Sequence, residues 1–173
     1  AVVSRDFVAA PAPTPASHAG TLVDTPHGLV AAWFGGKQAR DPSVGIWLAR
    51  REATGWTPPR EVATGVQADG SRLPTWNPVL SRARTGSLML SYKVGPDPQH
   101  WWGRATTPRD AVAHWSAARS LPPGILGPIQ DQPVPLPYSP IVIPSCNEPR
   151  HLSYHLSCPV LQRSPFYRHS HYV

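Results

Sequence analysis

The chain repeats itself with a period of about 57 residues, and this period constrains the fold more than any other feature. Gly28 recurs 58 positions later as Gly86, and Trp56 recurs 59 positions later as Trp115. Each copy contains short apolar runs separated by turn residues, a pattern that predicts β-strands rather than helices. A repeat of this length built from short strands is typical of the blades of a β-propeller.

Three strands are expected in each copy. The first copy places them at 21–23, 29–34 and 44–49, and the second at 77–80, 87–93 and 100–106. A third copy begins weakly at 134–136 and 141–143. Propellers use about four to eight blades, whereas 173 residues at this spacing hold about three. The predicted fold class is therefore all-β, an incomplete propeller of about three blades.

Composition divides the chain into three parts. The 23 Pro and 13 Gly disfavour long helices, because Pro interrupts a helix and Gly weakens it. Residues 1–17 contain a Pro/Ala-rich run that predicts an extended linker, and residues 18–145 form the partial propeller. Residues 146–173 are expected to be a divergent or disordered tail, because no Gly, Asp or Trp occurs after Leu136. A native extension and a frameshift both explain that tail, and the redox state of Cys146 and Cys158 stays open.

The charge balance does not point to a nucleic-acid partner. The formal net charge is +6, but the arginines are scattered rather than clustered in a patch. The longest apolar run, Leu29 to Gly36, is too short to span a bilayer. No metal site and no cofactor are expected, because the histidines and cysteines lack the spacing of metal ligands. The oligomeric state is left open.

Several motifs, in order along the chain, resemble the sialidase superfamily in its BNR-repeat-like (Asp-box) branch. They are HAGTLVDTPHGLVAAWFGG at 18–36, GIWLAR at 45–50, WNPVL at 76–80, YKVGP at 92–96, WWG at 101–103 and GILGPI at 124–129. The resemblance covers about residues 17 to 145 and implies a six-bladed propeller, of which this chain is expected to be a truncated part. It also implies a carbohydrate substrate, hydrolysis of terminal acidic sugars, and an extracellular location.

The Asp-box of the family is a turn staple remote from the catalytic face. The stretch from Pro108 to Trp115 keeps its Asp, as Asp110, and its Trp, but loses its Ser, Gly and Thr. The resemblance therefore implies that Asp110 and Trp115 have structural roles, with the carboxylate bonding turn amides and the indole packing beneath the turn.

The catalytic residues of the family are an Asp acid/base, a Tyr nucleophile paired with a Glu, and three Arg that bind the sugar carboxylate. The resemblance places the acid/base at Asp41, where partial burial would raise its pKa; the alternative is a turn Asp. His18 stands where the first Arg is expected, which departs from the family pattern. A protonated His18 would still bind a sugar carboxylate, and the alternative is a solvent-facing His at a strand start. Arg40 is a substrate contact or a solvated charge. Glu148 and Tyr154 are not assigned, so the chain is expected to lack its nucleophile.

The remaining candidates for sugar binding lie at the corresponding mouth of the second copy. They are Trp76, Asn77, Lys93, His100 and Trp101. A surface Trp there would stack on a sugar ring, although core packing is the alternative for the tryptophans and a rim charge for Lys93.

Three functions follow from these observations. The first is a glycoside hydrolase of the sialidase superfamily, in which Asp41 is the acid. The second is a non-catalytic carbohydrate-binding propeller or an inactive fragment. The third is a propeller polysaccharide lyase or a His-based glycosidase that uses His18 as its base.

Overall fold

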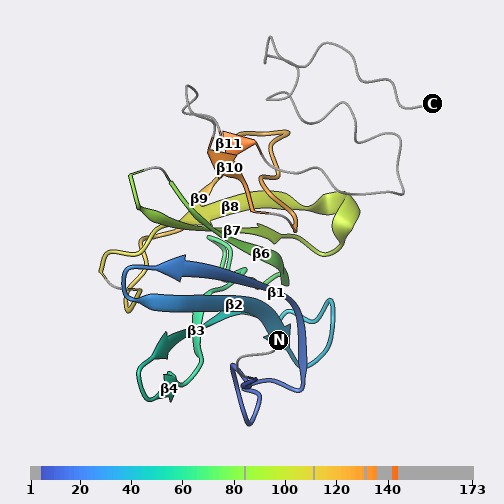
Figure 1. Cartoon of the computed structure of the whole chain (residues 1–173). Coiled ribbons are helices and arrows are strands. Elements are labelled where there is room, and N and C mark those ends of the chain that lie inside the picture. Colours follow the sequence, from blue (N-terminus) through green and yellow to red (C-terminus); the bar gives the residue numbers. More distant parts are fainter. Residues whose placement is uncertain (1–4, 84, 111, 131, 136–141, 144–173) are drawn as a thin grey trace, which may run out of the picture.

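The computed structural model describes residues 5–83, 85–110, 112–130, 132–135 and 142–143, which form antiparallel β-sheets (Figure 1). The first sheet contains β1 (Ala16–Thr25), β2 (Gly28–Gly36), β3 (Gly45–Glu52), β4 (Gly55–Trp56) and β5 (Arg60–Ala63), with β4 and β5 both paired to β3. The second contains β6 (Thr75–Arg82), β7 (Leu88–Val94), β8 (Trp102–Thr106) and β9 (Arg119–Ser120). A short pair follows, β10 (Val134–Pro135) and β11 (Val142–Ile143).

The sheets confirm the all-β prediction and the repeat. β1, β2 and β3 follow each other as β6, β7 and β8 do, and both sets are antiparallel neighbours in chain order. Apart from one 3₁₀ turn at Pro98–His100, no helix occurs in the described residues. In that part of the chain nothing helical is long and apolar enough to cross a membrane. The expected tail, with Cys146 and Cys158, lies outside the described residues.

The core lies where the two sheets meet. β6 packs against both β1 and β2, and Figure 1 shows the two sheets stacked along these strands. Val30 and Ile46 from the first sheet are fully buried, as are Leu80 and Leu90 from the second, and all four belong to one apolar cluster. Burial of each such side chain contributes roughly 1.5–3 kcal/mol. The fold is therefore part of a propeller whose adjacent blades share one core.

The turn between β1 and β2 requires a glycine. Gly28 has φ of +102°, and a Cβ built on it would lie 2.4 Å from the carbonyl oxygen of Arg51. Thr25 Oγ1 closes the turn by donating to the Gly28 carbonyl at 2.7 Å. Backbone conformation and lack of space therefore both exclude a side chain here.

Gly28→Ala is expected to lower the free energy of unfolding by about 2–3 kcal/mol, because strain at positive φ adds to the clash with Arg51. The matched control is Gly70→Ala, since Gly70 has φ of +83° but no atom within 4 Å of its added Cβ. The control should cost only about 1 kcal/mol. Urea denaturation followed by tryptophan fluorescence measures both; equal losses would contradict the steric argument.

Candidate functional site

One edge of the two sheets gathers strand ends and loops from both. β1 and β6 begin there, because Ala16 pairs with Gly36 at the end of β2 and Thr75 pairs with Val94 at the end of β7. The loop 37–44 between β2 and β3 and the loop 95–101 between β7 and β8 lie on the same edge. All the candidate residues from the sequence belong to it: His18, Arg40, Asp41, Trp76, Asn77, Lys93, His100 and Trp101.

The first strand of each sheet is irregular at the same place. The pairing register shifts between His18 and Thr21 in β1, and between Trp76 and Val79 in β6. Inside these shifts, Ala19 has φ of +46° and Asn77, 58 positions later, has φ of +36°. A bulge bends a strand and re-aims the neighbouring side chains. The repeat thus includes a backbone irregularity that turns His18 and Trp76 toward the same region.

Four aromatic rings form a row along this edge, which we call the aromatic row. The ring centroids of His18 and Phe34 are 5.6 Å apart, and those of Phe34 and Trp76 are 6.0 Å apart. Trp101 continues the row at 5.4 Å from Trp76. These separations lie in the range of favourable tilted aromatic contacts. The row therefore joins predicted site residues from both sheets, and Phe34 is the member that the sequence reasoning missed.

The two ends of the aromatic row are accessible and its middle is not. Phe34 and Trp76 are 7% and 8% exposed, and the Trp76 indole N–H donates to the Gly95 carbonyl at 2.8 Å. His18 is exposed and Trp101 is half-buried. Trp76 thus packs in the core, as one of the two sequence interpretations expected. A ligand would meet His18 and Trp101, held in place by the buried pair.

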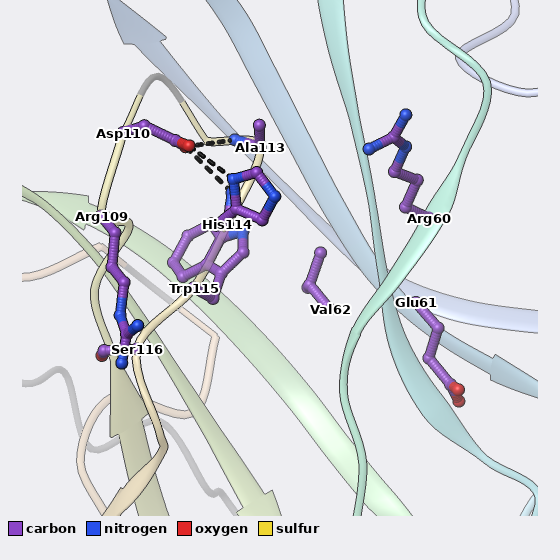
Figure 2. Close-up of a pocket in the computed structure, with 9 residues that line it drawn as sticks. All are labelled: Arg60, Glu61, Val62, Arg109, Asp110, Ala113, His114, Trp115 and Ser116. Carbon is purple, nitrogen blue, oxygen red and sulfur yellow. Dashed lines mark hydrogen bonds and ion pairs between the residues drawn. The ribbon is translucent and has the colours of Figure 1, made fainter.

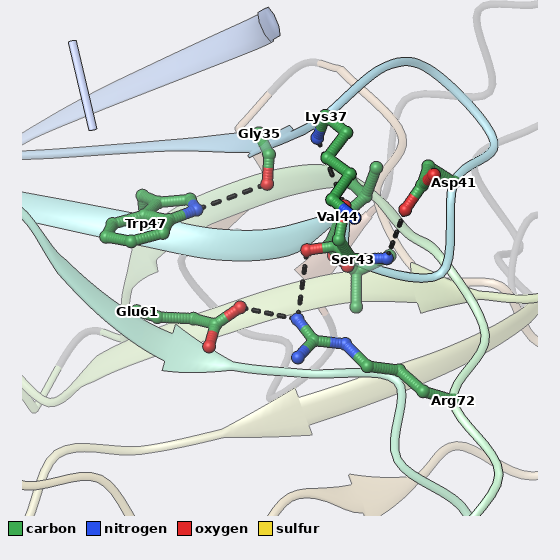
Figure 3. Close-up of polar contacts among 9 residues, drawn as sticks. Gly35, Lys37, Asp41, Ser43, Val44, Trp47, Glu61 and Arg72 are labelled. Atoms are coloured by element: carbon green, nitrogen blue, oxygen red, sulfur yellow. Dashed lines mark hydrogen bonds and ion pairs between the residues drawn. The ribbon is translucent and has the colours of Figure 1, made fainter. Parts of the chain in front are cut away.

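Asp41 lies in a tightly hydrogen-bonded turn within the loop 37–44 (Figure 3). Ser43 N–H donates to Asp41 Oδ1 at 2.7 Å, which is an Asx-turn bond. Val44 N–H donates to the Asp41 carbonyl at 2.9 Å, and Lys37 N–H donates to Ser43 Oγ at 3.1 Å. The carboxylate therefore has a fixed position on the loop.

The environment of Asp41 shifts its pKa in the direction opposite to the one expected from the sequence. Hydrogen bonds from the side chain and then the backbone N–H of Ser43 lower the pKa of Asp41, and the positive charges of Lys37 and Arg72 add to this effect. The rise in pKa expected from partial burial is therefore not found. Asp41 is an anion at neutral pH in this chain.

A second set of polar contacts holds the same loop to the rest of the site edge. Arg72 Nη2 donates to the Ser43 carbonyl at 3.0 Å and to Glu61 Oε1 at 2.6 Å (Figure 3). Thr75 Oγ1, at the start of β6, donates to the Val44 carbonyl at 3.1 Å. The loop that contains Asp41 is thus fixed from both sheets. Sequence reasoning missed Arg72 and Glu61 because neither lies within a family motif.

Lys93 is buried rather than placed on the rim. Its side chain is fully buried and its Nζ donates to the carbonyl of Pro128. Burial lowers the pKa of Lys93 from 10.5 to about 7. A sugar cannot reach this amine without displacing the segment that covers it, so Lys93 acts on the site, if at all, by holding that segment.

The three remaining candidates are polar and lie closer to solvent. Arg40 is exposed with φ of +68°, and Asn77 is half-buried at the bulge of β6. The His100 side chain is 70% exposed, and its Nδ1 lies 2.8 Å from Asp97 Oδ1. Hydrogen bonding by His100 lowers the pKa of Asp97. These groups can meet a ligand at the edge, where Asn77 follows Trp76 and His100 precedes Trp101 in the chain.

The turn from Pro108 to Trp115 lies at the opposite end of β8. Asp110 Oδ1 accepts hydrogen bonds from the backbone N–H groups of Ala113 and His114, each at 2.9 Å. Trp115 is partly buried against the core cluster. Asp110 and Trp115 therefore have the structural roles in this turn that the sequence implied.

Taken together, two antiparallel sheets that repeat at 58 residues and pack through their first strands are adjacent blades of a β-propeller, with candidate ligand groups at one edge. The BNR repeat-like domain family matches residues 27–164. The chain belongs to this family.

The chain is also similar to a solved structure. The Hadza microbial sialidase Hz136 matches with a TM-score of 0.51 and 17% sequence identity. The match covers 62% of this chain and 26% of that one, so the chain spans about a quarter of the length of that sialidase. Among curated proteins, the sequence has no significant match. The shared fold is part of a sialidase-like propeller.

Proposed function

We propose that this chain provides the acid/base side of a glycoside hydrolase site for terminal acidic sugars, as in the sialidase superfamily. The observation behind the proposal is the single edge on which the Asp41 loop and the accessible ends of the aromatic row, His18 and Trp101, occur together. Aromatic faces bind the apolar faces of sugar rings, and a positioned carboxyl group can protonate a leaving oxygen. Membership of the BNR repeat-like family and a fold shared with a sialidase support the same function.

Asp41 can act as a general acid only once a substrate has bound. Its pKa is lowered in the free chain, so it starts as an anion. The carboxylate of an acidic sugar bound nearby would raise that pKa, because two like charges at close range disfavour ionisation. Arg40 and Lys37, on the same loop, are the cations suited to hold the sugar carboxylate at this distance. Protonated Asp41 would then donate its proton to the glycosidic oxygen.

The nucleophile would come from residues outside this edge. Among the described residues Tyr92 is the only tyrosine, and its side chain is buried, with 1% exposed. Burial raises the pKa of Tyr92, which makes its phenolate less available for attack. Water activated by another group, or a Tyr/Glu pair from further blades, would complete the reaction.

The same observation favours a second candidate function, a non-catalytic carbohydrate-binding propeller. A site with an ionised Asp41 and a buried Tyr92 can bind a sugar without cleaving it. A fluorogenic sialoside distinguishes the two, when it is offered to this chain and to a form extended at its C-terminus. Release of the fluorophore by either form supports the hydrolase, and glycan binding without release supports the binding protein. Formation of an unsaturated uronate from a polyuronate would instead select a lyase with His18 as base.

Ser43→Ala is expected to raise the pKa of Asp41, because the Ser43 side chain is the largest cause that lowers it. The active protonated form of Asp41 would then persist to higher pH, so the alkaline limit of any hydrolysis should move upward. Titration of the Asp41 carboxyl carbon by NMR measures the shift directly.

The matched control for Ser43→Ala is Ser71→Ala. Ser71 donates to Asp69 Oδ1 through its N–H at 2.9 Å and its hydroxyl at 2.7 Å, and hydrogen bonding lowers the pKa of Asp69 too. Ser71→Ala should raise the pKa of Asp69 and leave that of Asp41 unchanged. An Asp41 titration that is the same with and without the Ser43 hydroxyl would contradict this account of the loop.

A further inference from the structure

A groove of about 490 Å³ lies between the two sheets, away from the candidate site. Its walls are β5 of the first sheet and the turn 107–116 that follows β8 in the second (Figure 2). The candidate site lies at the other end of β8, where Trp102 pairs with Val94. At about 3.3 Å per residue, β8 separates the two ends by roughly 13 Å. The groove is therefore a distinct feature of the surface.

Two arginines on opposite walls of the groove have no anionic partner. Figure 2 shows Arg60 on one wall and Arg109 on the other. Both side chains are exposed, and no ion pair or hydrogen bond engages either guanidinium in the described residues. Unpaired guanidinium groups present several N–H donors in a planar fork, which suits the carboxylate of a ligand.

The acidic groups around the groove are already engaged. Glu61 pairs with Arg72 at 2.6 Å. Asp110 accepts two backbone N–H groups of its own turn, and His114 Nδ1 lies 2.6 Å from its Oδ2. These contacts hold the pKa of Asp110 low and satisfy its carboxylate within the turn. The positive charge of the two arginines is therefore left for a ligand.

The floor of the groove is apolar. Val62 and Trp115 lie between the two arginines in Figure 2, and Trp115 is only partly buried. An indole and an aliphatic side chain flanked by hydrogen-bond donors form the surface on which a sugar ring packs, with its charged group held at the side. A volume of about 490 Å³ is also within the range of small-molecule sites.

We propose that this groove is a second carbohydrate site, which binds a carboxylated sugar through Arg60 and Arg109 with its ring over Trp115 and Val62. The site binds without catalysis and does not rest on the proposed function of the opposite edge. On a polymeric substrate, it would retain a chain whose acidic units are spaced along it.

Binding of labelled saccharides, followed by fluorescence anisotropy, tests the proposal. The probes are 3′-sialyllactose and trigalacturonate, which contain the two carboxylated sugar types, and cellotriose as the neutral control. Either acidic probe is expected to bind, and the tighter one identifies the sugar. The double variant Arg60→Ala/Arg109→Ala should weaken that binding at least tenfold, and Arg60→Lys/Arg109→Lys should weaken it less, because charge remains while the planar fork is lost.

The matched control is Arg5→Ala/Arg119→Ala, which removes the same charge from two exposed arginines outside the groove. It should bind within twofold of the unmodified chain. An equal loss of binding in the Arg5/Arg119 variant would show that overall charge causes the effect, and would overturn the groove site. Equal binding of cellotriose, or equal displacement by inorganic sulfate at the same concentration, would also overturn a carboxylated-sugar site. A loss of binding in His18→Ala, together with full binding in Arg60→Ala/Arg109→Ala, would assign the sugar to the opposite edge and overturn the groove site.

Discussion

Asp41→Asn is expected to lower kcat/KM for a sialoside by at least about 100-fold in any form of the protein that hydrolyses it, because general acid catalysis contributes roughly 10²–10⁴ in rate. The asparagine side-chain oxygen can still accept the Ser43 N–H bond that Asp41 Oδ1 accepts at 2.7 Å. The loop should therefore keep its conformation, and thermal unfolding should change little. The measurement is a fluorogenic assay across pH, with the unfolding midpoint recorded for each variant.

Asp69→Asn is the control for this variant. Asp69 lies in a turn of the same kind, and hydrogen bonds from the Ser71 side chain and then the Ser71 backbone N–H lower its pKa. Its replacement should leave kcat/KM unchanged. If Asp41→Asn retains kcat, Asp41 has no part in proton transfer, and the turn interpretation of this residue is the correct one.

Lys93→Met is expected to change how stability depends on pH by several kcal/mol. The pKa of Lys93 is about 7 in the folded chain, against 10.5 for an ordinary lysine. Between these two values the unfolded chain binds more protons, so stability should rise as pH rises from about 7 toward 10.5. Below pH 7 both states are protonated and the cost of burying the ammonium is present in full. Methionine removes that cost and fills a similar volume.

The variant should therefore be more stable than the unmodified chain near pH 6. The difference should shrink as pH approaches 10, where the neutral amine still donates to Pro128 and methionine leaves that carbonyl unpaired. Urea denaturation at several pH values measures the trend. Lys37, the other lysine, is exposed, so Lys37→Met should leave the pH dependence between pH 6 and 10 unchanged. Parallel curves for Lys93→Met and the unmodified chain would show that the buried amine is not the cause.

The regular part of the fold could be predicted from the sequence because it depends on local pattern. The recurrence of Gly28 as Gly86 marks the two first turns, and both residues have positive φ. The apolar run at 29–34 lies within β2, and the run at 87–93 lies within β7 except for Ser87. Two short strands, β10 and β11, also form where a third copy was expected.

The backbone irregularities could not be predicted in the same way. The stretch Trp76-Asn77-Pro78 was interpreted as the opening of a regular strand, whereas the chain bulges there. The corresponding bulge after His18 in β1 has different residue types, so the sequence alone does not show that the two bulges are equivalent. The bulge is stabilised by contacts between sheets, such as the Leu80 N–H donated to Thr21 Oγ1 at 3.3 Å, which no local window contains.

The location of the candidate residues in the fold could be predicted from the sequence, but their electrostatics could not. The family motifs assigned the candidate residues to strand ends and loops, and in the structure these ends and loops lie on one edge. The pKa of Asp41 is lowered mainly by hydrogen bonds from Ser43 in the folded turn, with a smaller effect from the distant Arg72. The Lys93 amine is covered by Pro128, which lies 35 positions away in the chain. Effects of that kind follow from packing, so a lone Lys at a strand end was interpreted as a rim charge and a loop Asp as an acid.

The most direct test of the account is to map where an acidic sugar binds, using backbone and indole N–H signals in NMR spectra of the isotope-labelled chain with 3′-sialyllactose. The account predicts that the signals of His18, of Arg40 to Ser43 and of Trp101 shift with one common affinity. A titration that leaves all of these signals in place would contradict a sugar site at this edge, whatever happens at Arg60 and Arg109.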